Sequence, residues 1–410
     1  MGESNWAGNL TYGADAVTTP RTVAEVQDAV AGATHVKALG SRHCFNTIAD
    51  SPGGLLLDLH ALGTGVEIGD GTVTVGGSAR YGDFAQQLHE AGLALPNLAS
   101  LPHITVAGSV ATGTHGSGRR QPGLAAAVSG IELVTADGSL KTFTRADAEF
   151  PGLVVSLGAV GVVTRLTLDV VPTFDVRQDV FDDLPWEAAD AHFDEIEDAG
   201  YSVSMFTNWA NDRIDQVWVK SREGTGRTGL FGAVPADGPR HPAHAAGIPA
   251  DNCTPQQGVP GPWHERLPHF ALAFTPSVGD ELQSEYFVPY GAATAAIRAV
   301  REIGELVAPL LLVSEIRAIA GDDLWLSPCH GGDRVALHFT WQPRQPEVEA
   351  VLPVLEERLA PFGARPHWGK LFHGVPGEYP RLAEFRALAG KLDPQGKFRN
   401  PFLDRNVFGG

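Results

Sequence analysis

A histidine inside a tight glycine and serine turn is the feature that most constrains how this chain can fold. The turn, residues 40–46 (GSRHCFN), directly follows the short apolar segment 36–39, which predicts a β-strand. Consecutive backbone N–H groups in such a turn form a nest that binds anions, and a glycine lets a ligand approach the backbone closely. The sequence therefore predicts a strand that ends in a phosphate-binding turn, with His43 at its centre.

A second segment, residues 98–118, carries glycines and hydroxyl side chains without helical or strand periodicity. We expect it to be a ligand-binding loop, because its glycines permit close approach and its hydroxyls and amides can donate hydrogen bonds. A Rossmann nicotinamide site is disfavoured here, since the intervals between Gly113, Gly116 and Gly118 do not match G-x-G-x-x-G. A surface connection remains the alternative for this loop considered alone.

These two segments, with a third at residues 156–164, resemble the FAD-binding domain of the sugar and polyol oxidases in the vanillyl-alcohol oxidase superfamily. The resemblance extends from residues 5–9 to residues 393–400. It implies an α+β fold with a two-subdomain FAD-binding domain (1–170), a substrate domain with an antiparallel sheet covered by helices (171–365), and a C-terminal segment (366–410) that returns to the FAD domain.

The resemblance also implies which residues hold FAD, and it implies a covalent bond from His43 to the 8α-methyl group of the flavin. The other expected contacts are Gly40, Ser41, Arg42, Cys44, Asn46, Ala99, Ser100, Gly108, Ser109, Thr112, Gly113, Thr114, His115, Gly116, Gly161, Val162 and Val163. Two residues depart from the usual Gly-Ser-Gly-His-Ser-Phe-Asn run, namely Arg42 and Cys44. Arg42 is strained if the glycine it replaces had a positive φ, or its guanidinium reaches a phosphate.

Composition restricts the class of partner. The 410 residues are 43% hydrophobic and carry a net charge of −18, so nucleic acid and an anionic membrane surface would both repel the chain. The three cysteines are widely spaced, and neither a leader nor a membrane-spanning apolar run is evident. We expect a soluble cytoplasmic protein, with a monomer as the simplest state, and no metal, because His241 and His244 lack a third ligand nearby.

Local patterns predict several further elements. Thr22 and Glu25 form a capping box that opens a helix through about residue 33, and Asp137-Gly138 marks a hairpin within 131–143. The other expected elements are strands at 54–59, 72–76, 202–209 and 216–220, and helices at 81–91, 292–310 and 346–359.

Two strand-like segments each place a polar pair on one face. Glu315 and Arg317 alternate in residues 312–319, and His338 and Thr340 alternate in 335–341. Buried sheets avoid polar groups unless these are paired or bind a ligand. A solvated face or a structural ion pair would also explain the pattern. By the family resemblance, these four residues form the polyol-binding wall together with Ser100 and Lys370.

The implied activity is FAD-dependent oxidation of the primary alcohol end of alditols such as xylitol, sorbitol or the smaller glycerol, with O2 reduced to hydrogen peroxide. In that reaction Arg317 and Lys370 would stabilise the developing alkoxide, His338 would accept the hydroxyl proton, and Glu315 would grip a hydroxyl. The alternatives are a sugar-lactone oxidase or dehydrogenase on the same fold, and a catalytically silent flavin- or carbohydrate-binding protein.

Overall fold

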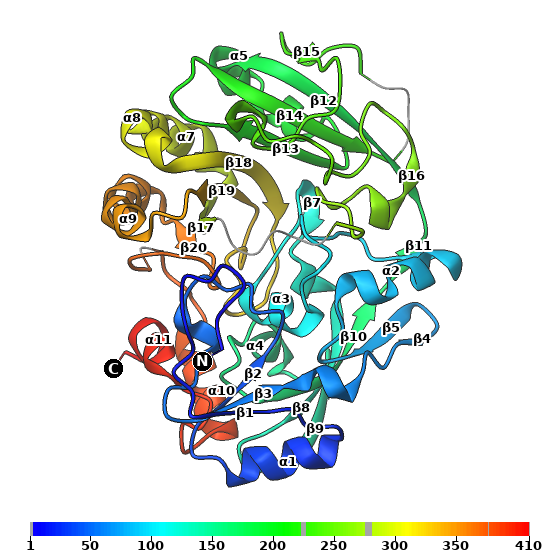
Figure 1. The fold of residues 1–410 in the computed structure, drawn as a ribbon, viewed down its shortest axis with the longest axis vertical. Coiled ribbons are helices and arrows are strands. Elements are labelled where there is room, and N and C mark those ends of the chain that lie inside the picture. Colours follow the sequence, from blue (N-terminus) through cyan, green and yellow to red (C-terminus); the bar gives the residue numbers. More distant parts are fainter. Residues whose placement is uncertain (1–2, 223–226, 275–280, 376, 410) are drawn as a thin grey trace.

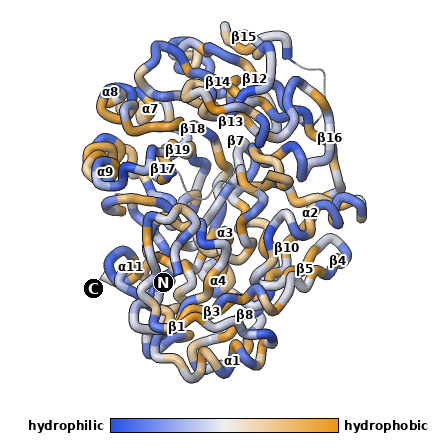
Figure 2. The backbone as a smooth tube through the Cα atoms, in the orientation of Figure 1, coloured by the Kyte–Doolittle hydropathy of each residue, from blue (hydrophilic) through white to orange (hydrophobic). Residues whose placement is uncertain are grey.

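The computed structural model describes residues 3–222, 227–274, 281–375 and 377–409. In Figure 1 the N-terminal third (blue to cyan) and the last helices (red) form the lower half, and the middle of the chain (green to orange) forms the upper half. Hydrophobic and hydrophilic stretches alternate along the helices in Figure 2, as expected for helices that cover sheets on one side. Within the described residues no helix is long and apolar enough to span a membrane.

The lower half contains a small parallel sheet in the order β1-β3-β2. Its strands are β1 (Ala16–Thr18), β3 (Leu55–Asp58) and β2 (Val36–Leu39), and α1 (Val23–Gly32) packs on it through buried Val26 and Val30. The Thr22 side chain accepts a hydrogen bond of 3.2 Å from the Glu25 backbone N–H, so the predicted helix start is confirmed. The predicted strand before the histidine turn is also confirmed.

An antiparallel sheet in the order β4-β5-β10-β8-β9 lies beside it. The strands are β4 (Glu67–Ile68), β5 (Thr72–Gly76), β10 (Val162–Asp169), β8 (Val128–Val134) and β9 (Leu140–Thr144). Around them lie α2 (Tyr81–Glu90), α3 (Val106–Thr112) and α4 (Phe150–Val154), and β6 (Leu93–Ala94) pairs with β11 (Val171–Pro172). The predicted hairpin is confirmed, with Gly138 at φ +80° in its turn.

The upper half is one large sheet in the order β15-β12-β14-β13-β18-β19-β17-β20. Its strands are β12 (Asp175–Pro185), β13 (Ser202–Thr207), β14 (Arg213–Ser221), β15 (Val234–Pro235), β17 (Leu282–Pro289), β18 (Leu311–Ala320), β19 (Arg334–Trp341) and β20 (Arg365–Pro366), with β16 (Gly261–Pro262) pairing with β12. A segment of the lower half, β7 (Gly118–Pro122), pairs in parallel with β18. The two halves are therefore joined through shared hydrogen bonding.

Helices cover the outer face of this sheet (Figure 1). Side chains on its other face line the cavity described below. The helices are α5 (Trp186–Ala191), α6 (Phe193–Glu197), α7 (Ala293–Arg301), α8 (Gly304–Val307) and α9 (Gln345–Leu359). The buried residues of α7 (Ala293, Ala296, Ile297 and Val300) follow the spacing of one helical face.

Two predicted elements were wrong. Residues 106–112, expected to be loop, form α3, because Val106 and Val110 lie four residues apart and both enter the core. The single helix expected over 292–310 breaks after Arg301, because Gly304 packs against the next layer. A Cβ atom on Gly304 would lie 2.4 Å from the Trp209 carbonyl oxygen.

The C-terminal segment contacts the strand before the histidine turn and the residues directly after it. After α10 (Leu382–Leu392), the Lys397 carbonyl accepts a hydrogen bond from the Val36 backbone N–H. The side chain of Asn400, just before α11 (Pro401–Leu403), donates to the carbonyls of Thr47, Ile48 and Asp50.

We expect Asn400→Ala to lower the free energy of unfolding by about 1–3 kcal/mol, because buried carbonyls would lose their donor. The measurement is the urea unfolding midpoint followed by tryptophan fluorescence. Asn406→Ala is the matched control, since among the described residues the half-buried Asn406 side chain donates to the Phe402 carbonyl alone, in the preceding turn. Equal losses in the two variants would contradict a special role for Asn400.

Candidate active site

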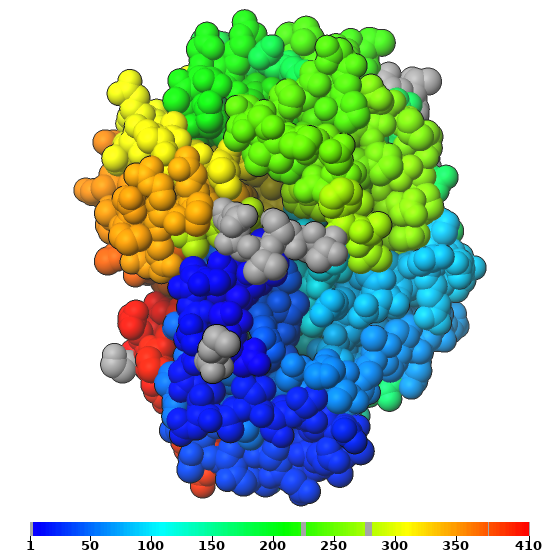
Figure 3. All heavy atoms as spheres, in the orientation of Figure 1, coloured from blue at the N-terminus to red at the C-terminus, as the bar shows by residue number. Residues whose placement is uncertain are grey.

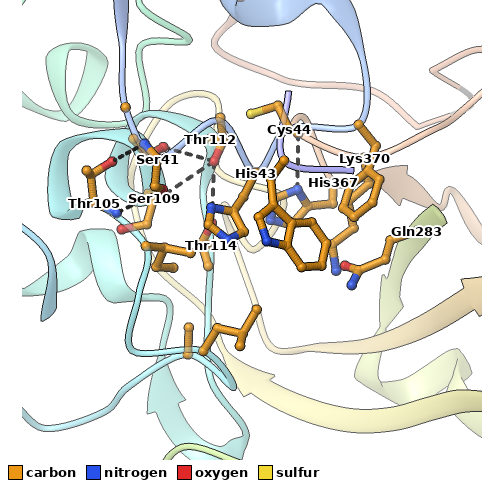
Figure 4. A pocket seen from close by; sticks show the side chains of 18 of the residues that line it. Ser41, His43, Cys44, Thr105, Ser109, Thr112, Thr114, Gln283, His367 and Lys370 are labelled. Carbon is orange, nitrogen blue, oxygen red and sulfur yellow. Dashed lines mark hydrogen bonds between the residues drawn. The ribbon is translucent and has the colours of Figure 1, made fainter. Parts of the chain in front are cut away.

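One cavity of about 330 Å³ lies between the two halves of the fold. Figure 4 shows Ser41 on the left, His43 near the centre, and Lys370 and Gln283 of β17 on the right. In the space-filling view of Figure 3 the blue N-terminal segment lies below the yellow and green atoms of the upper half. Of the predicted cofactor residues, Gly40, Ser41, Arg42, His43, Cys44, Ala99, Ser100, Gly108, Ser109, Thr112, Thr114, His115, Gly161, Val162 and Val163 line the cavity.

His43 enters the cavity as an unpartnered buried imidazole. Its ring stacks on Trp6 with centroids 5.0 Å apart and planes at 20°. Neither ring nitrogen has a hydrogen-bond partner, although both are buried. Burial lowers the pKa of His43 to about 4, so the ring is neutral at pH 7 and carries a free nitrogen lone pair. A buried polar atom without a partner suggests a ligand at that position.

Arg42 keeps the positive φ of the glycine that it replaces, at +63°. Its guanidinium pairs with Glu3 and lies 3.5 Å from Asp58 Oδ2, so it is directed at carboxylates. The phosphate contact that we considered for Arg42 is therefore not supported. The conformational strain expected at this residue is present, and it costs of order 1 kcal/mol.

Two hydrogen bonds between Ser41 and Thr105 join the histidine turn to the second predicted loop. The Thr105 backbone N–H donates to Ser41 Oγ at 3.1 Å, and the Ser41 N–H donates to Thr105 Oγ1 at 3.3 Å. A Cβ atom on Gly40 would lie 2.5 Å from Thr105 Oγ1, and one on Gly108 would lie 2.8 Å from it. These glycines are therefore needed for the close contact between the two segments.

The hydroxyls of α3 already have protein partners. Ser109 Oγ donates to the Val106 carbonyl at 2.8 Å and lies 2.9 Å from the Tyr81 hydroxyl. Thr112 Oγ1 donates to the Gly108 carbonyl at 3.1 Å. Because both hydroxyls are already hydrogen-bonded to the protein, they do not support the expectation that these side chains bind a pyrophosphate. Both residues nevertheless line the cavity.

Three predicted cofactor residues lie outside the cavity wall. Asn46 donates through Nδ2 to the carbonyls of Trp368 (2.8 Å) and Lys370 (2.7 Å), so it fixes the segment that carries Lys370. Gly113 ends α3 in a left-handed conformation. Gly116 packs so tightly that a Cβ atom would lie 2.4 Å from the Leu98 carbonyl oxygen.

The wall opposite the histidine turn is built by the register of β18 and β19, which places Glu315 beside His338. Glu315, Arg317, His338 and Thr340 are all buried and all line the cavity, as does Lys370. The two polar pairs that alternation predicted therefore meet in one site. Ser100 joins them, because its Oγ accepts a hydrogen bond of 3.3 Å from Arg317 Nη1.

A buried carboxylate that sequence reasoning missed holds this site together. Glu285 on β17 lies opposite His338 and accepts hydrogen bonds from Lys370 Nζ at 2.6 Å and from Arg317 Nη2 at 3.0 Å. Burial alone would raise the pKa of Glu285, but Lys370, His115 and Arg317 hold it well below its usual value. The signal available in the sequence was an acidic residue alternating with Gln283 on the strand.

His338 is a neutral imidazole between two partners. Its Nδ1 lies 2.8 Å from Lys370 Nζ, and its Nε2 lies 3.0 Å from Thr340 Oγ1. Burial and the neighbouring Lys370 lower the pKa of His338 to about 4. Because an ammonium can only donate, Nδ1 carries the lone pair and Nε2 carries the proton.

The charges of the site balance. Burial alone would raise the pKa of Glu315, but Arg317 and His269 beside it bring it below its usual value, so this carboxylate is ionised. Two carboxylates, Glu285 and Glu315, then face the cations Arg317 and Lys370. The site suits an uncharged, hydroxyl-rich ligand better than an anion. No group of three or more metal-ligating side chains is found among the described residues.

Comparison with known proteins agrees with this arrangement. Residues 14–144 match the model of the FAD binding domain family, and residues 280–406 match that of D-arabinono-1,4-lactone oxidase. An alditol oxidase of Streptomyces sp. is 52% identical over 98% of this chain and 97% of its own length. An L-gulono-1,4-lactone dehydrogenase of Mycobacterium tuberculosis is 27% identical over 98% of both chains.

Solved structures agree on the fold. Cholesterol oxidase from B. sterolicum superimposes with a TM-score of 0.78 at 17% identity, over 98% of this chain and 96% of its own. The buried free imidazole of His43, in a cavity lined by the FAD-domain match, fits a bound flavin. By its full-length similarity, this chain belongs to the alditol oxidase family of FAD-dependent oxidoreductases, within the vanillyl-alcohol oxidase superfamily.

Proposed function

We propose that this enzyme oxidises the primary alcohol end of alditols such as xylitol and sorbitol to the aldose, with O2 as electron acceptor and hydrogen peroxide as second product. The observation that carries the proposal is the buried cluster in which Lys370 and Arg317 share the carboxylate of Glu285 beside neutral His338. Bound FAD supplies the hydride acceptor and the site of oxygen reduction. The protein must supply proton removal and substrate placement.

Proton removal is the difficult part for an unactivated alcohol, because its hydroxyl is a very weak acid at pH 7. Lys370 and Arg317 would stabilise the negative charge that develops on the oxygen, in a cavity that excludes most water. Their charges are held in place by Glu285, so little reorganisation is needed when the substrate reacts. His338 would accept the proton on Nδ1 once Lys370 turns its N–H toward the substrate oxygen.

The remaining hydroxyls of the alditol would be held by neutral and acidic groups. Ser100 and Thr340 offer hydroxyls, and Glu315 offers a carboxylate oxygen that can accept a hydrogen bond. A linear polyol presents several donors and no charge, which matches the balanced charge of the site. The 52% identity to an alditol oxidase supports the same substrate class.

We further propose that His43 carries a covalent bond to FAD. A neutral buried imidazole with a free lone pair supports this role. In this arrangement the elements within 1–170 and 366–410 hold the cofactor, and those within 171–365 hold the substrate together with Ser100 and Lys370. A cytoplasmic location is supported by three cysteines that are all free.

A sugar-lactone oxidase or dehydrogenase is the second candidate, because the match at 280–406 is to a lactone oxidase family and a relative is a lactone dehydrogenase. Ala99, a small side chain in the cavity wall, would influence whether O2 reaches the flavin. A peroxide assay over a panel of alditols and sugar lactones tests the proposal. Peroxide with xylitol and sorbitol supports it, and peroxide with lactones alone overturns it.

We expect the flavin to stay with the protein on acid precipitation, because His43 holds it covalently. His43→Ala should release any bound flavin into the supernatant, whereas His60→Ala, at an exposed histidine, should not. The measurement is the visible absorbance of pellet and supernatant. Flavin in the wild-type supernatant would show that no covalent link exists.

We expect Lys370→Met to slow anaerobic reduction of the flavin by xylitol by about 10²–10³, because a cation next to the developing alkoxide is lost. The visible spectrum and the covalent link should be retained. Lys391→Met is the matched control, since Lys391 is exposed and pairs with Glu149 on the surface. Reduction at the wild-type rate in Lys370→Met would mean that the alcohol is activated elsewhere.

We expect the acid limb of the pH profile for xylitol oxidation to lie near pH 4. The neutral imidazole of His338 is the form that accepts a proton, and its pKa is lowered to about 4, so the rate should be flat at neutral pH and fall only as the pH approaches 4. Stopped-flow flavin reduction at several pH values measures this, and His338→Gln should remove the limb. A limb near pH 6.5 would argue against a buried neutral histidine as the base.

A further inference from the structure

His269 lies in the cavity wall although it belongs to no strand or helix. Its ring meets Phe206 and Trp218 edge to face, with centroids 5.7 and 5.2 Å away, and its side chain is only 5% exposed. Its Nε2 lies 2.9 Å from Oε1 of Glu315. Two aromatic rings from β13 and β14 thus hold the imidazole against a carboxylate of the substrate site.

The other side of the ring faces a buried lysine. Lys220 Nζ, from β14, lies 2.5 Å from the Leu267 carbonyl oxygen, 3.1 Å from that of Pro268 and 3.1 Å from His269 Nδ1. Three acceptors match the three donors of an ammonium, which has no lone pair. Nδ1 of His269 must then accept, so the ring proton is on Nε2 and is donated to Glu315.

The charge states agree with this tautomer at mildly acidic pH. Burial lowers the pKa of Lys220 to about 7, although Glu315 and Cys253 raise it in part. Burial and then the charge of Lys220 lower the pKa of His269 to about 4, although Glu315 opposes this shift. At pH 6 the lysine is therefore mainly an ammonium and the imidazole is neutral. The carboxylate of Glu315 is ionised, as described above.

The backbone of the same residue fixes a second substrate-binding group. The N–H groups of His269 and Phe270 both donate to the Ser100 carbonyl, at 3.0 and 3.2 Å. Ser100 Oγ in turn accepts from Arg317. One short segment thus connects the flavin-side residue Ser100 with Glu315 on the sheet.

We propose that Lys220 and His269 are positioning residues for substrate binding. Lys220 fixes the tautomer of His269. The Nε2–H of His269 then holds one oxygen of Glu315, so that the other oxygen faces Arg317 and a substrate hydroxyl. The proposal rests on the proposed alditol oxidation. It deepens that function, because it assigns the orientation of the acceptor carboxylate to a pair of residues that do not touch the reacting carbon.

Two polar replacements of His269 separate this role from packing. In His269→Gln the amide nitrogen reaches the Nε2 position and can still donate to Glu315, whereas in His269→Asn the amide reaches only the Nδ1 position beside Lys220. At pH 6 we expect His269→Asn to raise KM for xylitol roughly 10- to 100-fold, the effect of losing a hydrogen bond to a buried charge, with a much smaller change in kcat. His269→Gln should stay close to wild type, as should the control His192→Gln at an exposed histidine.

A double-mutant cycle tests whether His269 acts through Glu315. In a Glu315→Gln background, His269→Asn should change KM by no more than about twofold, because the carboxylate that it positions is gone. Equal KM values for the Asn and Gln variants, or an undiminished effect in the Glu315→Gln background, would overturn the proposal. Failure of the wild-type enzyme to be reduced by any alditol would instead overturn the proposed function.

Discussion

The site depends on one buried carboxylate, Glu285. A carboxylate without exposure to water is stable only if cations and donors surround it, and Glu285 has Lys370 and Arg317 within hydrogen-bond distance. The same contacts make two buried cations tolerable in a cavity that must accept an uncharged substrate. Removing Glu285 would leave Lys370 without its carboxylate partner and Arg317 with Glu315 alone. An unpaired buried cation costs more than the ion pair contributes.

The position of Glu285 follows from sheet topology. β17 pairs with β19 on one side and with β20 on the other, and the segment after β20 carries Lys370. The register that brings Glu285 beside His338 also brings His338 beside Glu315, so three neighbouring strands contribute one side chain each. On the other side of the cavity the hydrogen bonds between Ser41 and Thr105 hold the histidine turn at a fixed place.

Local patterns in the sequence predicted those features of this protein that depend on residues close together in the chain. The cap at Thr22 and the alternation of Glu315 and Arg317 are properties of short segments, and both were found. The helix at 106–112 was missed because glycine and hydroxyl residues obscure the pair Val106 and Val110. Glu285 was missed because its alternation with Gln283 does not show which partners the strand register brings to it. His269 was missed because its role arises from a loop folded against a distant sheet, which no local pattern specifies.

The anaerobic visible spectrum of the purified protein, recorded before and after addition of xylitol, tests the central claim most directly. If the Glu285 cluster activates an alditol next to bound FAD, the protein is yellow and xylitol bleaches it, whereas a sugar lactone does not. A yellow protein that xylitol leaves unbleached, or a colourless protein that carries no flavin, would contradict the account.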